Sequence, residues 1–353
     1  MDVVTVAVTG VSGVVAQRLL PLLTDDADVA RVVGLDVREP RRRVRGLDFH
    51  RVDIAGAELK PLFEGVDVLV HLASVVDPTP DESLMAHVNI EGTRRVLDAA
   101  AGVGVRKVIR VSTATVYGAW ANNPVPLTED APLRPNPGFT PAVHAAEAER
   151  LLFEWGEEHP AVTVTTLRAA PVLGPGAERL ISRLLLGRPA LRARGAGGPV
   201  QGVHVDDLAS ALALAVGRDL PGVYNVAADG WLTLDDVKAL LPRSWLPPVP
   251  SELLDRILGQ LWSTGLGDVP PSVVPYLVYP WVVANDRLKR AGWQPKYTNE
   301  EAILEGVDAL PTPSRALRYA ALVGSAVAAG SVAGLVLRRI QLRKRRKRRA
   351  QVR

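Results

Sequence analysis

A glycine turn directly after a short apolar run constrains the fold of this chain more than any other feature. The run Val3–Val8 is typical of a buried strand. It is followed, at intervals of three residues, by Gly10, Gly13 and Ala16. Gly10 can adopt the positive φ of a tight turn, and Gly13 leaves no side chain between the backbone and a ligand. Ala16 lets a helix pack closely on the strand, and the free N–H groups at the helix start can hold a pyrophosphate. The alternative is an ordinary strand–turn–helix joint.

A second apolar run, Val29–Asp36, ends in a carboxylate twenty residues after Ala16. In a dinucleotide site, a carboxylate at this place accepts hydrogen bonds from the adenosine ribose. It also repels the 2′-phosphate of NADP, so we expect NAD as the cofactor. Arg38 and Arg41–Arg43 weaken that preference because they could neutralise the extra phosphate. The alternative for Asp36 is a solvated acid in a loop.

Strand-like and helix-like segments alternate along the next part of the chain. Their order favours an α/β fold built on a doubly wound, parallel, Rossmann-type sheet. The strand-like runs are almost continuously apolar, which suits a sheet covered on both faces. The expected strands are Val66–Ala73, Val105–Ser112 and Val162–Leu167, and the expected helices are Val88–Val103 and Ala142–Glu158.

Several further motifs follow in order and extend this pattern over most of the chain. They are Val52-Asp-Ile54, His71-Leu-Ala-Ser74, Val88-Asn-Ile-Glu-Gly-Thr-Arg-Arg-Val-Leu-Asp-Ala-Ala100, Val111-Ser-Thr-Ala-Thr-Val-Tyr-Gly118, Leu167-Arg-Ala-Ala-Pro-Val-Leu-Gly-Pro175, Val203-His-Val-Asp-Asp207 and Gly222-Val-Tyr-Asn-Val226. With these motifs, residues 3–310 resemble the extended short-chain dehydrogenase/reductases, the NAD-dependent epimerase/dehydratase group. The resemblance implies one two-lobed unit over residues 1–310, with a smaller C-terminal lobe, mainly residues 172–202 and 227–310, covering the substrate.

The resemblance also assigns positions around the cofactor. It implies that Asp53 and Ile54 flank the adenine and that the segment Leu72–Ser74 passes under the cofactor. Pro171 and Val172 would border the nicotinamide, and Asn89 would lie on the long helix behind the cofactor. Together with the glycine turn, this gives the predicted cofactor-binding residues: Gly10, Ser12, Gly13, Val14, Asp36, Asp53, Ile54, Leu72, Ala73, Ser74, Asn89, Pro171 and Val172.

The catalytic acid and base that the resemblance implies are missing. Proton transfer in this family uses a tyrosine and a lysine one helical turn apart, on the same helix face. A serine or threonine at the end of the preceding strand steadies the substrate oxygen, and Thr113 has that place. On the next helix, however, the positions of tyrosine and lysine hold Pro141 and Ala145. Neither has a titratable group, so the standard mechanism is in doubt, although Pro141 suits the first turn of a helix.

His144 is a candidate substitute for the missing base. A shift of the helix register by one residue would bring Thr140 and His144 to the two catalytic positions. Such a shift, however, rotates the pair by about 100° around the helix axis, away from the nicotinamide. The alternative for His144 is a half-buried polar residue near the start of a helix.

Composition excludes several other kinds of site. The chain has no cysteine, and its six histidines show no paired spacing, so neither disulfides nor a metal site is expected. Residues 338–353 hold ten Lys or Arg and no acid, which leaves 32 bases against 38 acids in the rest of the chain. The folded part is therefore acidic, and nucleic-acid binding by it is not expected.

An apolar stretch precedes the basic tail. Residues 319–337 are nineteen uncharged residues that, as a helix, would reach about 28 Å, close to the thickness of a bilayer core. We expect a linker at 311–318, a membrane helix at 319–337 and a basic tail at 338–353 that suits anionic headgroups. The membrane topology stays open, because positive-inside logic conflicts with a cytoplasmic NAD-binding unit. A helix packed on the protein, leaving it soluble and cytoplasmic, is the alternative, and a tail that binds nucleic acid is a weaker one.

Two functions fit these predictions. One is an NAD-dependent enzyme for a nucleotide sugar or another hydroxy or keto substrate, with impaired or non-standard catalysis. The other is a non-catalytic, membrane-attached NAD-binding sensor or scaffold. Many relatives form homodimers through the two helices that correspond here to Val88–Val103 and Ala142–Glu158, so these helices are the candidate interface of a homodimer.

Overall fold

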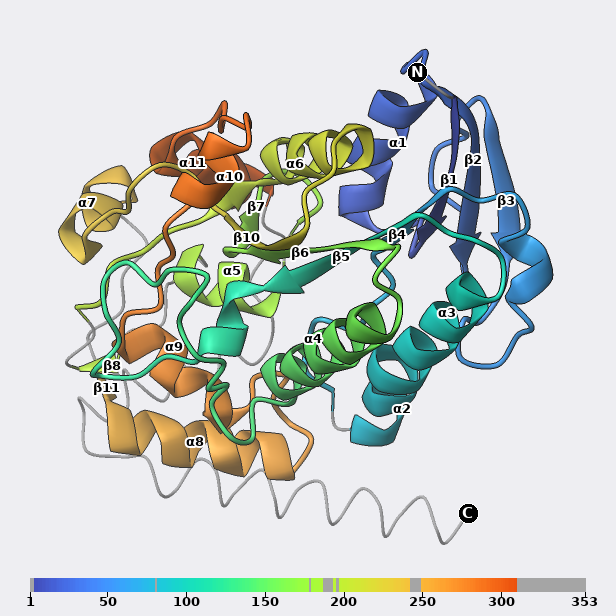
Figure 1. Ribbon diagram of the computed structural model, residues 1–353. Helices are drawn as coiled ribbons and strands as arrows, with labels where there is room; N and C mark the ends of the chain where they lie inside the picture. Colours follow the sequence, from blue (N-terminus) through green and yellow to red (C-terminus); the bar gives the residue numbers. More distant parts are fainter. Residues whose placement is uncertain are drawn as a thin grey trace, which may run out of the picture.

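Seven strands form one parallel sheet in the computed structural model of the chain (Figure 1). The structure describes residues 3–79, 81–177, 179–186, 193–194, 197–241 and 249–309. The sheet order is β10-β6-β5-β4-β1-β2-β3, and each hydrogen-bonded pair runs parallel. The strands are β1 (Val4–Thr9), β2 (Val29–Asp36), β3 (Leu47–Arg51), β4 (Val68–His71), β5 (Lys107–Thr113), β6 (Thr163–Ala169) and β10 (Gly222–Val226). The predicted doubly wound α/β sheet is confirmed.

Both faces of this sheet are buried, which explains why its strands are so apolar. Successive side chains of a strand point to opposite faces. In β1, Val6 and Val8 belong to one hydrophobic cluster, whereas Ala7 belongs to another. All four residues of β4 are buried. The sheet therefore separates two hydrophobic layers, each closed by helices.

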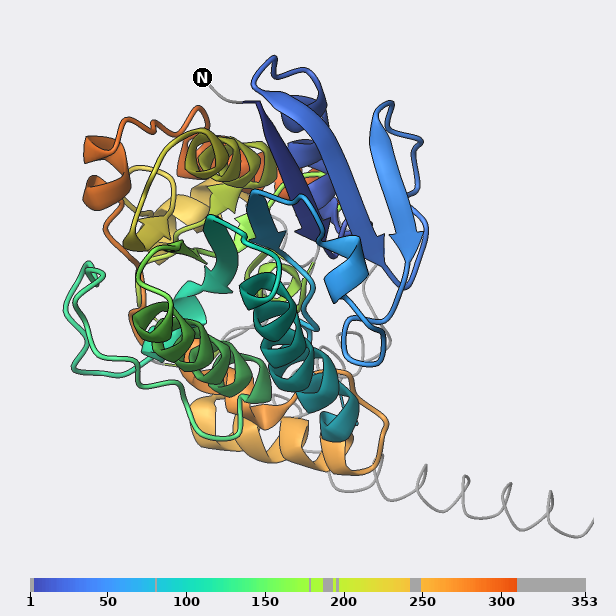
Figure 2. The same ribbon diagram turned by 45° about the vertical axis from the view of Figure 1, so that its right-hand side comes forward.

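One layer is covered by α1 and α6, which pack on each other, and the opposite layer by α3 and α4 (Figures 1 and 2). The helix predicted at Val88–Val103 begins with a π-helical turn, and the one predicted at Ala142 begins two residues earlier, at Thr140. The bounds of these elements are α1 (Val14–Thr24), α2 (Glu82–Ala86), the π-helical turn η2 (His87–Glu91), α3 (Gly92–Ala101), α4 (Thr140–Glu158) and α6 (Val205–Gly217).

The remaining elements lie mainly beyond the carboxyl ends of the strands, and Figures 1 and 2 show α8 and α9 there. Except for η1, η3 and β9, they come from the two segments in which we expect the substrate lobe. The pairs β7–β9 and β8–β11 form separate small sheets. The elements are η1 (Lys60–Leu62), η3 (Ala114–Tyr117), β7 (Val172–Leu173), α5 (Leu180–Leu186), β8 (Ala193–Arg194), β9 (Val203–His204), α7 (Leu234–Leu240), β11 (Val249–Pro250), α8 (Ser251–Ser263), η4 (Pro271–Val273), α9 (Val274–Val278), α10 (Asp286–Arg290) and α11 (Asn299–Ala309).

The predicted membrane attachment concerns another part of the chain. The linker 311–318, the apolar helix 319–337 and the basic tail 338–353 lie outside the described residues. Within the described ranges, no helix is both long enough and apolar enough to cross a bilayer.

Candidate functional site

The turn between β1 and α1 requires glycine at its first position. Gly10 has a φ of +71°, and a Cβ atom added there would lie 2.6 Å from the backbone nitrogen of Ala73. The absence of a side chain therefore lets the loop after β4 lie directly against the turn. Gly13 is the N-cap residue of α1, and no side chain caps this helix end. The first-turn N–H groups of α1 are thus not occupied by a capping side chain, as a phosphate site requires.

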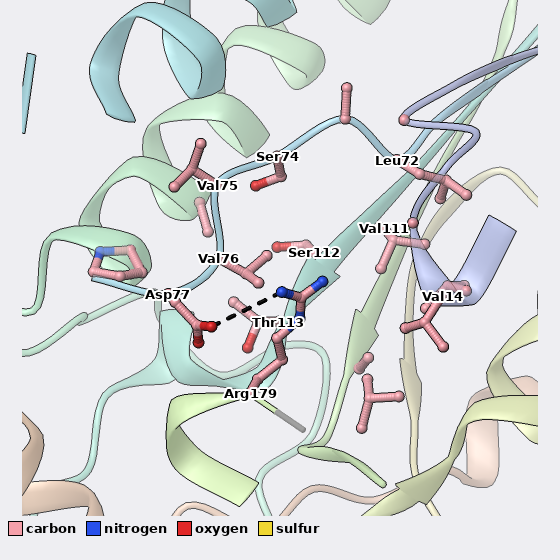
Figure 3. A pocket seen from close by; sticks show the side chains of 18 of the residues that line it. Val14, Leu72, Ser74, Val75, Val76, Asp77, Val111, Ser112, Thr113 and Arg179 are labelled. Atoms are coloured by element: carbon pink, nitrogen blue, oxygen red, sulfur yellow. Dashed lines mark ion pairs between the residues drawn. The ribbon is translucent and has the colours of Figure 1, made fainter. Parts of the chain in front are cut away.

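A cavity of about 390 Å³ opens beside this turn. It extends from Asp36 and Asp53, at the edge of the sheet formed by β2 and β3, to Thr113 at the end of β5. Figure 3 shows Val14 on one side of the cavity and Ser74, Val75 and Asp77 on the other. A cavity at the carboxyl ends of parallel strands is the usual ligand position in such sheets.

Most of the predicted cofactor-binding residues meet in this cavity. Its lining includes Gly10, Gly13, Val14, Asp36, Asp53, Ile54, Leu72, Ala73, Ser74, Pro171 and Val172. Two predicted residues, Ser12 and Asn89, are not part of that lining. Both residues hold lining residues in place through hydrogen bonds, and their part in cofactor binding stays a prediction.

Ser12 and Asn89 each support a neighbouring segment. The backbone N–H of Ser12 donates to Oδ2 of Asp36 at 3.0 Å, which fixes the carboxylate beside the glycine turn. Asn89 is buried, and its side chain makes paired hydrogen bonds with the backbone of Val75, accepting from N–H at 2.7 Å and donating to the carbonyl at 2.9 Å. The hydroxyl of Ser74 also donates to Asn89. Asn89 therefore fixes the loop that forms the cavity wall.

A buried histidine connects this loop to the core. Nδ1 of His71 lies 2.7 Å from Oγ1 of Thr9, and Nε2 lies 3.0 Å from Oγ1 of Thr93. Because Thr93 donates its own proton to the carbonyl of Asn89, it must accept from the Nε2–H of His71. Nδ1 then accepts from Thr9, whose oxygen in turn accepts the N–H of Ala73. Burial, together with the charge of Arg110, lowers the pKa of His71 to about 3, so the ring stays neutral.

The predicted catalytic region is where the cavity meets β5 and α4. Thr113, Pro141 and Ala145 all line the cavity. Oγ1 of Thr113 lies 3.1 Å from Oγ1 of Thr115. Pro141 is the second residue of α4, where a proline is tolerated because its nitrogen needs no partner. The two lining positions of α4 are thus one turn apart and carry no titratable group.

His144 is not among the lining residues of this cavity. Its position is one residue before Ala145, about 100° around the helix. Burial lowers the pKa of His144, and the carboxylates of Glu82 and Glu147 oppose this shift. Its Nδ1 is buried and has no hydrogen-bond partner. The structure therefore does not bring the candidate substitute base to the place where Thr113 lies.

Tyr117 also stays away from the cavity, because a buried polar network holds it. Its hydroxyl donates to Asn225 at 2.8 Å and accepts from Nη1 of Arg168 at 2.8 Å. Arg168 also binds Glu149 of α4 through Nη2 at 2.7 Å and Nε at 2.9 Å. The hydroxyl of Ser112 donates to the same carboxylate. The network joins α4 to the sheet and gives Tyr117 a structural role.

An ion pair of the cavity was not expected from the sequence. Asp77 and Arg179 form an ion pair at 3.8 Å, and Figure 3 shows them facing each other near Thr113. Asp77 also accepts the backbone N–H of Leu180 at 2.7 Å, which fixes the start of α5. Asp77 follows the motif His71–Ser74, and Arg179 follows the motif that ends at Pro175. No spacing rule relates two positions so far apart in the chain.

Similarity to known proteins agrees with this geometry. The family model of the NAD dependent epimerase/dehydratase family matches residues 6–227. An uncharacterized protein of Mycobacterium tuberculosis is 28% identical over 310 residues, which cover 84% of this chain and 81% of that protein. The dTDP-glucose 4,6-dehydratase of Streptomyces griseus is 33% identical over 203 residues, covering 55% of this chain and 60% of the enzyme.

Solved structures show the same fold. UDP-glucose 4-epimerase from Thermus thermophilus, in complex with NAD, is 26% identical, with a TM-score of 0.66 over 86% of this chain and 98% of the epimerase. UDP-glucuronic acid 4-epimerase from Bacillus cereus, also with NAD, is 19% identical, with a TM-score of 0.65 over 86% of this chain and 98% of that chain, and shows the fold alone. Because the family model covers well over half of the residues, this chain belongs to the NAD-dependent epimerase/dehydratase family.

Proposed function

We propose that the cavity binds NAD across the carboxyl ends of β1, β2, β4 and β5. The adenosine half would lie at Asp36, Asp53 and Ile54, and the pyrophosphate at the uncapped start of α1. The nicotinamide half would lie beside Thr113, Pro171 and Val172. The observation that carries this proposal is that a single cavity is lined by all three groups. The NAD complex of the related Thermus thermophilus epimerase supports the choice of cofactor.

The carboxylate of Asp36 favours NAD over NADP. It is held in place by the N–H groups of Ser12 and Arg38, which donate to its two oxygens at 3.0 and 2.9 Å. A carboxylate in this position repels a phosphate on the 2′-oxygen of the ribose. The side chain of Arg38 lies two residues further along the chain. Its positive charge could neutralise a 2′-phosphate, which would reduce the preference for NAD.

The substrate class would be a nucleotide sugar or another hydroxy or keto compound. Support comes from the dTDP-glucose dehydratase of Streptomyces griseus and from the UDP-glucose epimerase of Thermus thermophilus. Bound NAD would accept a hydride from the substrate and return it later in the reaction. Thr113 would orient the substrate oxygen through its hydroxyl.

Proton transfer at that oxygen would be impaired or non-standard. The face of α4 that meets the cavity carries Pro141 and Ala145, and neither can donate or accept a proton. His144 lies on another side of the helix. Water admitted to the cavity would then have to move the proton, and a positioned acid or base typically contributes about 10²- to 10⁴-fold in rate.

The second candidate function is a non-catalytic NAD-binding sensor or scaffold attached to the membrane. The same two residues of α4 favour it, because they leave the dinucleotide site intact while removing the proton-transfer groups. Attachment would use residues 319–353, with the folded unit in the cytoplasm; a soluble cytoplasmic protein is the alternative. A homodimer through α3 and α4 would cover Val143 and Phe153 of α4, which are 39% and 66% exposed.

Calorimetry with NAD and NADP tests the cofactor, and a panel of nucleotide sugars tests turnover. We expect NAD to bind with at least micromolar affinity and NADP more weakly. Incubation of the purified full chain with NAD or NADH and each sugar, followed by absorbance and mass spectrometry, then separates the two functions. A changed sugar supports the enzyme, and binding without any product supports the sensor. Absence of NAD binding would overturn both.

A further inference from the structure

The fourth residue of β5 is an arginine in the interior of the molecule. Arg110 is only 4% exposed and lies between the apolar residues Ile109 and Val111. In the β4–β5 register it is paired with His71. Ser112 points to the same face of β5, since side chains alternate along a strand. Ser112 bonds to Glu149 of α4, so this is the face that α3 and α4 cover.

Arg110 lacks the partners that other buried cations of the sheet have. Lys107, on the same strand, donates to the carbonyls of Val216 and Arg218 at 3.0 and 2.8 Å. Arg168 binds Glu149 and Tyr117. By contrast, Nη1 of Arg110 is buried without a partner, and within the described part of the chain no hydrogen bond holds its guanidinium, although the carboxylate of Glu149 attracts its charge without a direct ion pair. A buried charge without hydrogen bonds destabilises a protein unless a ligand completes it.

The position of Arg110 in the cavity indicates which part of a ligand it would meet. It lines the cavity together with Pro141 and Ala145, the two residues of α4 that offer no donor. In the sheet, β2 and β1 lie on one side of β4, and β5 lies on the other. A dinucleotide whose adenosine is at Asp36 and whose pyrophosphate is at Gly13 therefore reaches β5 with its other ribose.

We propose that Arg110 is a cofactor-contacting residue, whose guanidinium donates hydrogen bonds to the hydroxyl oxygens of the ribose on the nicotinamide side. This inference rests on the proposed function, because it takes NAD as the occupant of the cavity. The guanidinium supplies the donor and the fixed positive charge that α4 does not provide. A guanidinium presents several N–H groups in one plane, which suits two neighbouring hydroxyl oxygens.

The proposal has two consequences for a variant without this charge. Arg110→Met keeps most of the volume and removes the cation. In the ligand-free protein, its removal should leave the melting temperature unchanged or higher, because a buried charge without hydrogen bonds is lost. In the complex, its removal should weaken binding of any ligand that carries the second ribose by about tenfold or more.

Calorimetry with a series of shortened ligands tests the assignment on the full chain. We expect Arg110→Met to weaken NAD and ADP-ribose, which have the second ribose, and to leave AMP and ADP unchanged. Arg110→Lys keeps the charge but not the planar fork, so its loss of affinity for ADP-ribose should be smaller. Arg106→Met is the matched control: Arg106 lies just before β5, is paired with Asp67 at 2.8 Å, and does not line the cavity.

Each outcome decides the matter. Equal affinity of the wild type and Arg110→Met for ADP-ribose overturns the inference and leaves the proposed function intact. Weakened binding of AMP and ADP-ribose alike, or loss of folding in Arg110→Met, assigns Arg110 a structural role and also overturns the inference. If the wild type binds none of the four ligands, the proposed function fails and the inference fails with it.

Discussion

At the scale of single residues, Asp36 is the group proposed to contact the adenosine ribose of the cofactor. Its carboxylate lines the cavity and is fixed by two backbone N–H groups, so it can accept from a ribose without first being ordered. Asp36→Arg reverses the charge at this point. We expect NAD affinity to fall by about tenfold or more, since hydrogen bonds to a charged group are lost, and the ratio of NADP to NAD affinity to rise.

Calorimetry with both dinucleotides measures this change. Asp48→Arg is a suitable control, because Asp48 lies on the neighbouring strand β3 and pairs with Arg31 outside the cavity. An unchanged NAD affinity in Asp36→Arg, or an equal loss in the control, would contradict the role given to Asp36.

His71 makes the stability of the fold depend on pH. Its pKa is about 3 in the folded protein against 6.5 for a free side chain. Below pH 6.5 the unfolded chain therefore binds a proton that the folded protein does not bind. The free energy of unfolding should fall as the pH decreases from 6.5 toward 3, by on the order of 4 kcal/mol from this group.

Urea unfolding between pH 7.5 and pH 4 checks this expectation. His71→Asn removes the titrating ring, so its stability should depend less on pH in this window even if the variant is less stable at neutral pH. Parallel pH profiles for the wild type and His71→Asn would show that another group causes the acid sensitivity.

At the scale of the elements, the turn between β1 and α1 depends on glycine for two separate reasons. Gly10 has a positive φ and also lies against the backbone of the loop after β4. Gly104 has a φ of +81° with no atom within 4 Å of an added Cβ, so a substitution there measures the cost of the positive φ alone. We expect Gly104→Ala to cost about 1–2 kcal/mol of stability, and Gly10→Ala about 1–3 kcal/mol more.

Chemical denaturation of the two variants measures the difference, and NAD titration adds a functional readout. Gly10→Ala should also weaken NAD binding, because the loop that carries Ala73 must move. Equal destabilisation of the two variants would mean that the contact with this loop contributes nothing.

The α4 helix offers a direct test of the proposed loss of the catalytic acid and base. Pro141 and Ala145 lie one turn apart and both line the cavity, so the double variant Pro141→Tyr with Ala145→Lys would present a phenol and an amine to the same space. We expect this variant not to lower any turnover of a nucleotide sugar, and a working pair would raise it by about 10²-fold or more. Mass spectrometry of the sugar products, with Ala145→Lys alone as the control, measures this. A sharp loss of an existing activity would show that the present residues take part in catalysis.

Within the large sheet, the sequence predicted the strands whose side chains are mostly buried and missed the edge strand β3. The runs that became β1, β2, β4, β5 and β6 combine buried apolar residues with a few polar ones, which keeps their pattern clear. The edge strand β3 alternates between exposed and partly buried residues and includes the charged Asp48, so it lacks such a run. Segments linked by spacing rules, such as the glycine turn and Asp36, could be assigned to one cavity. The ion pair Asp77–Arg179 and the buried Arg110 could not be assigned to this cavity from the sequence. Their places in it depend on how segments far apart in the chain pack together.

At the scale of the whole molecule, the dinucleotide site and the C-terminal segment should be separable. The residues that line the cavity come from positions 10–281, and the described structure ends at residue 309. Removal of residues 311–353 should therefore leave NAD affinity unchanged within about twofold, a change of less than about 0.5 kcal/mol.

If residues 319–353 attach the protein to membranes, the same truncation should abolish flotation with vesicles that contain anionic lipid. Calorimetry and vesicle flotation of both forms measure the two properties, and a truncated form that still floats would place the attachment elsewhere.

The unpaired guanidinium of Arg110 also bears on how long the protein survives. Whatever binds the folded state and not the unfolded chain reduces the unfolded fraction, and proteases degrade mainly that fraction. A buried guanidinium without hydrogen bonds destabilises the ligand-free protein, so this form would be degraded by proteases faster than the complex. The abundance of this protein would then rise with the supply of the ligand that fills the cavity.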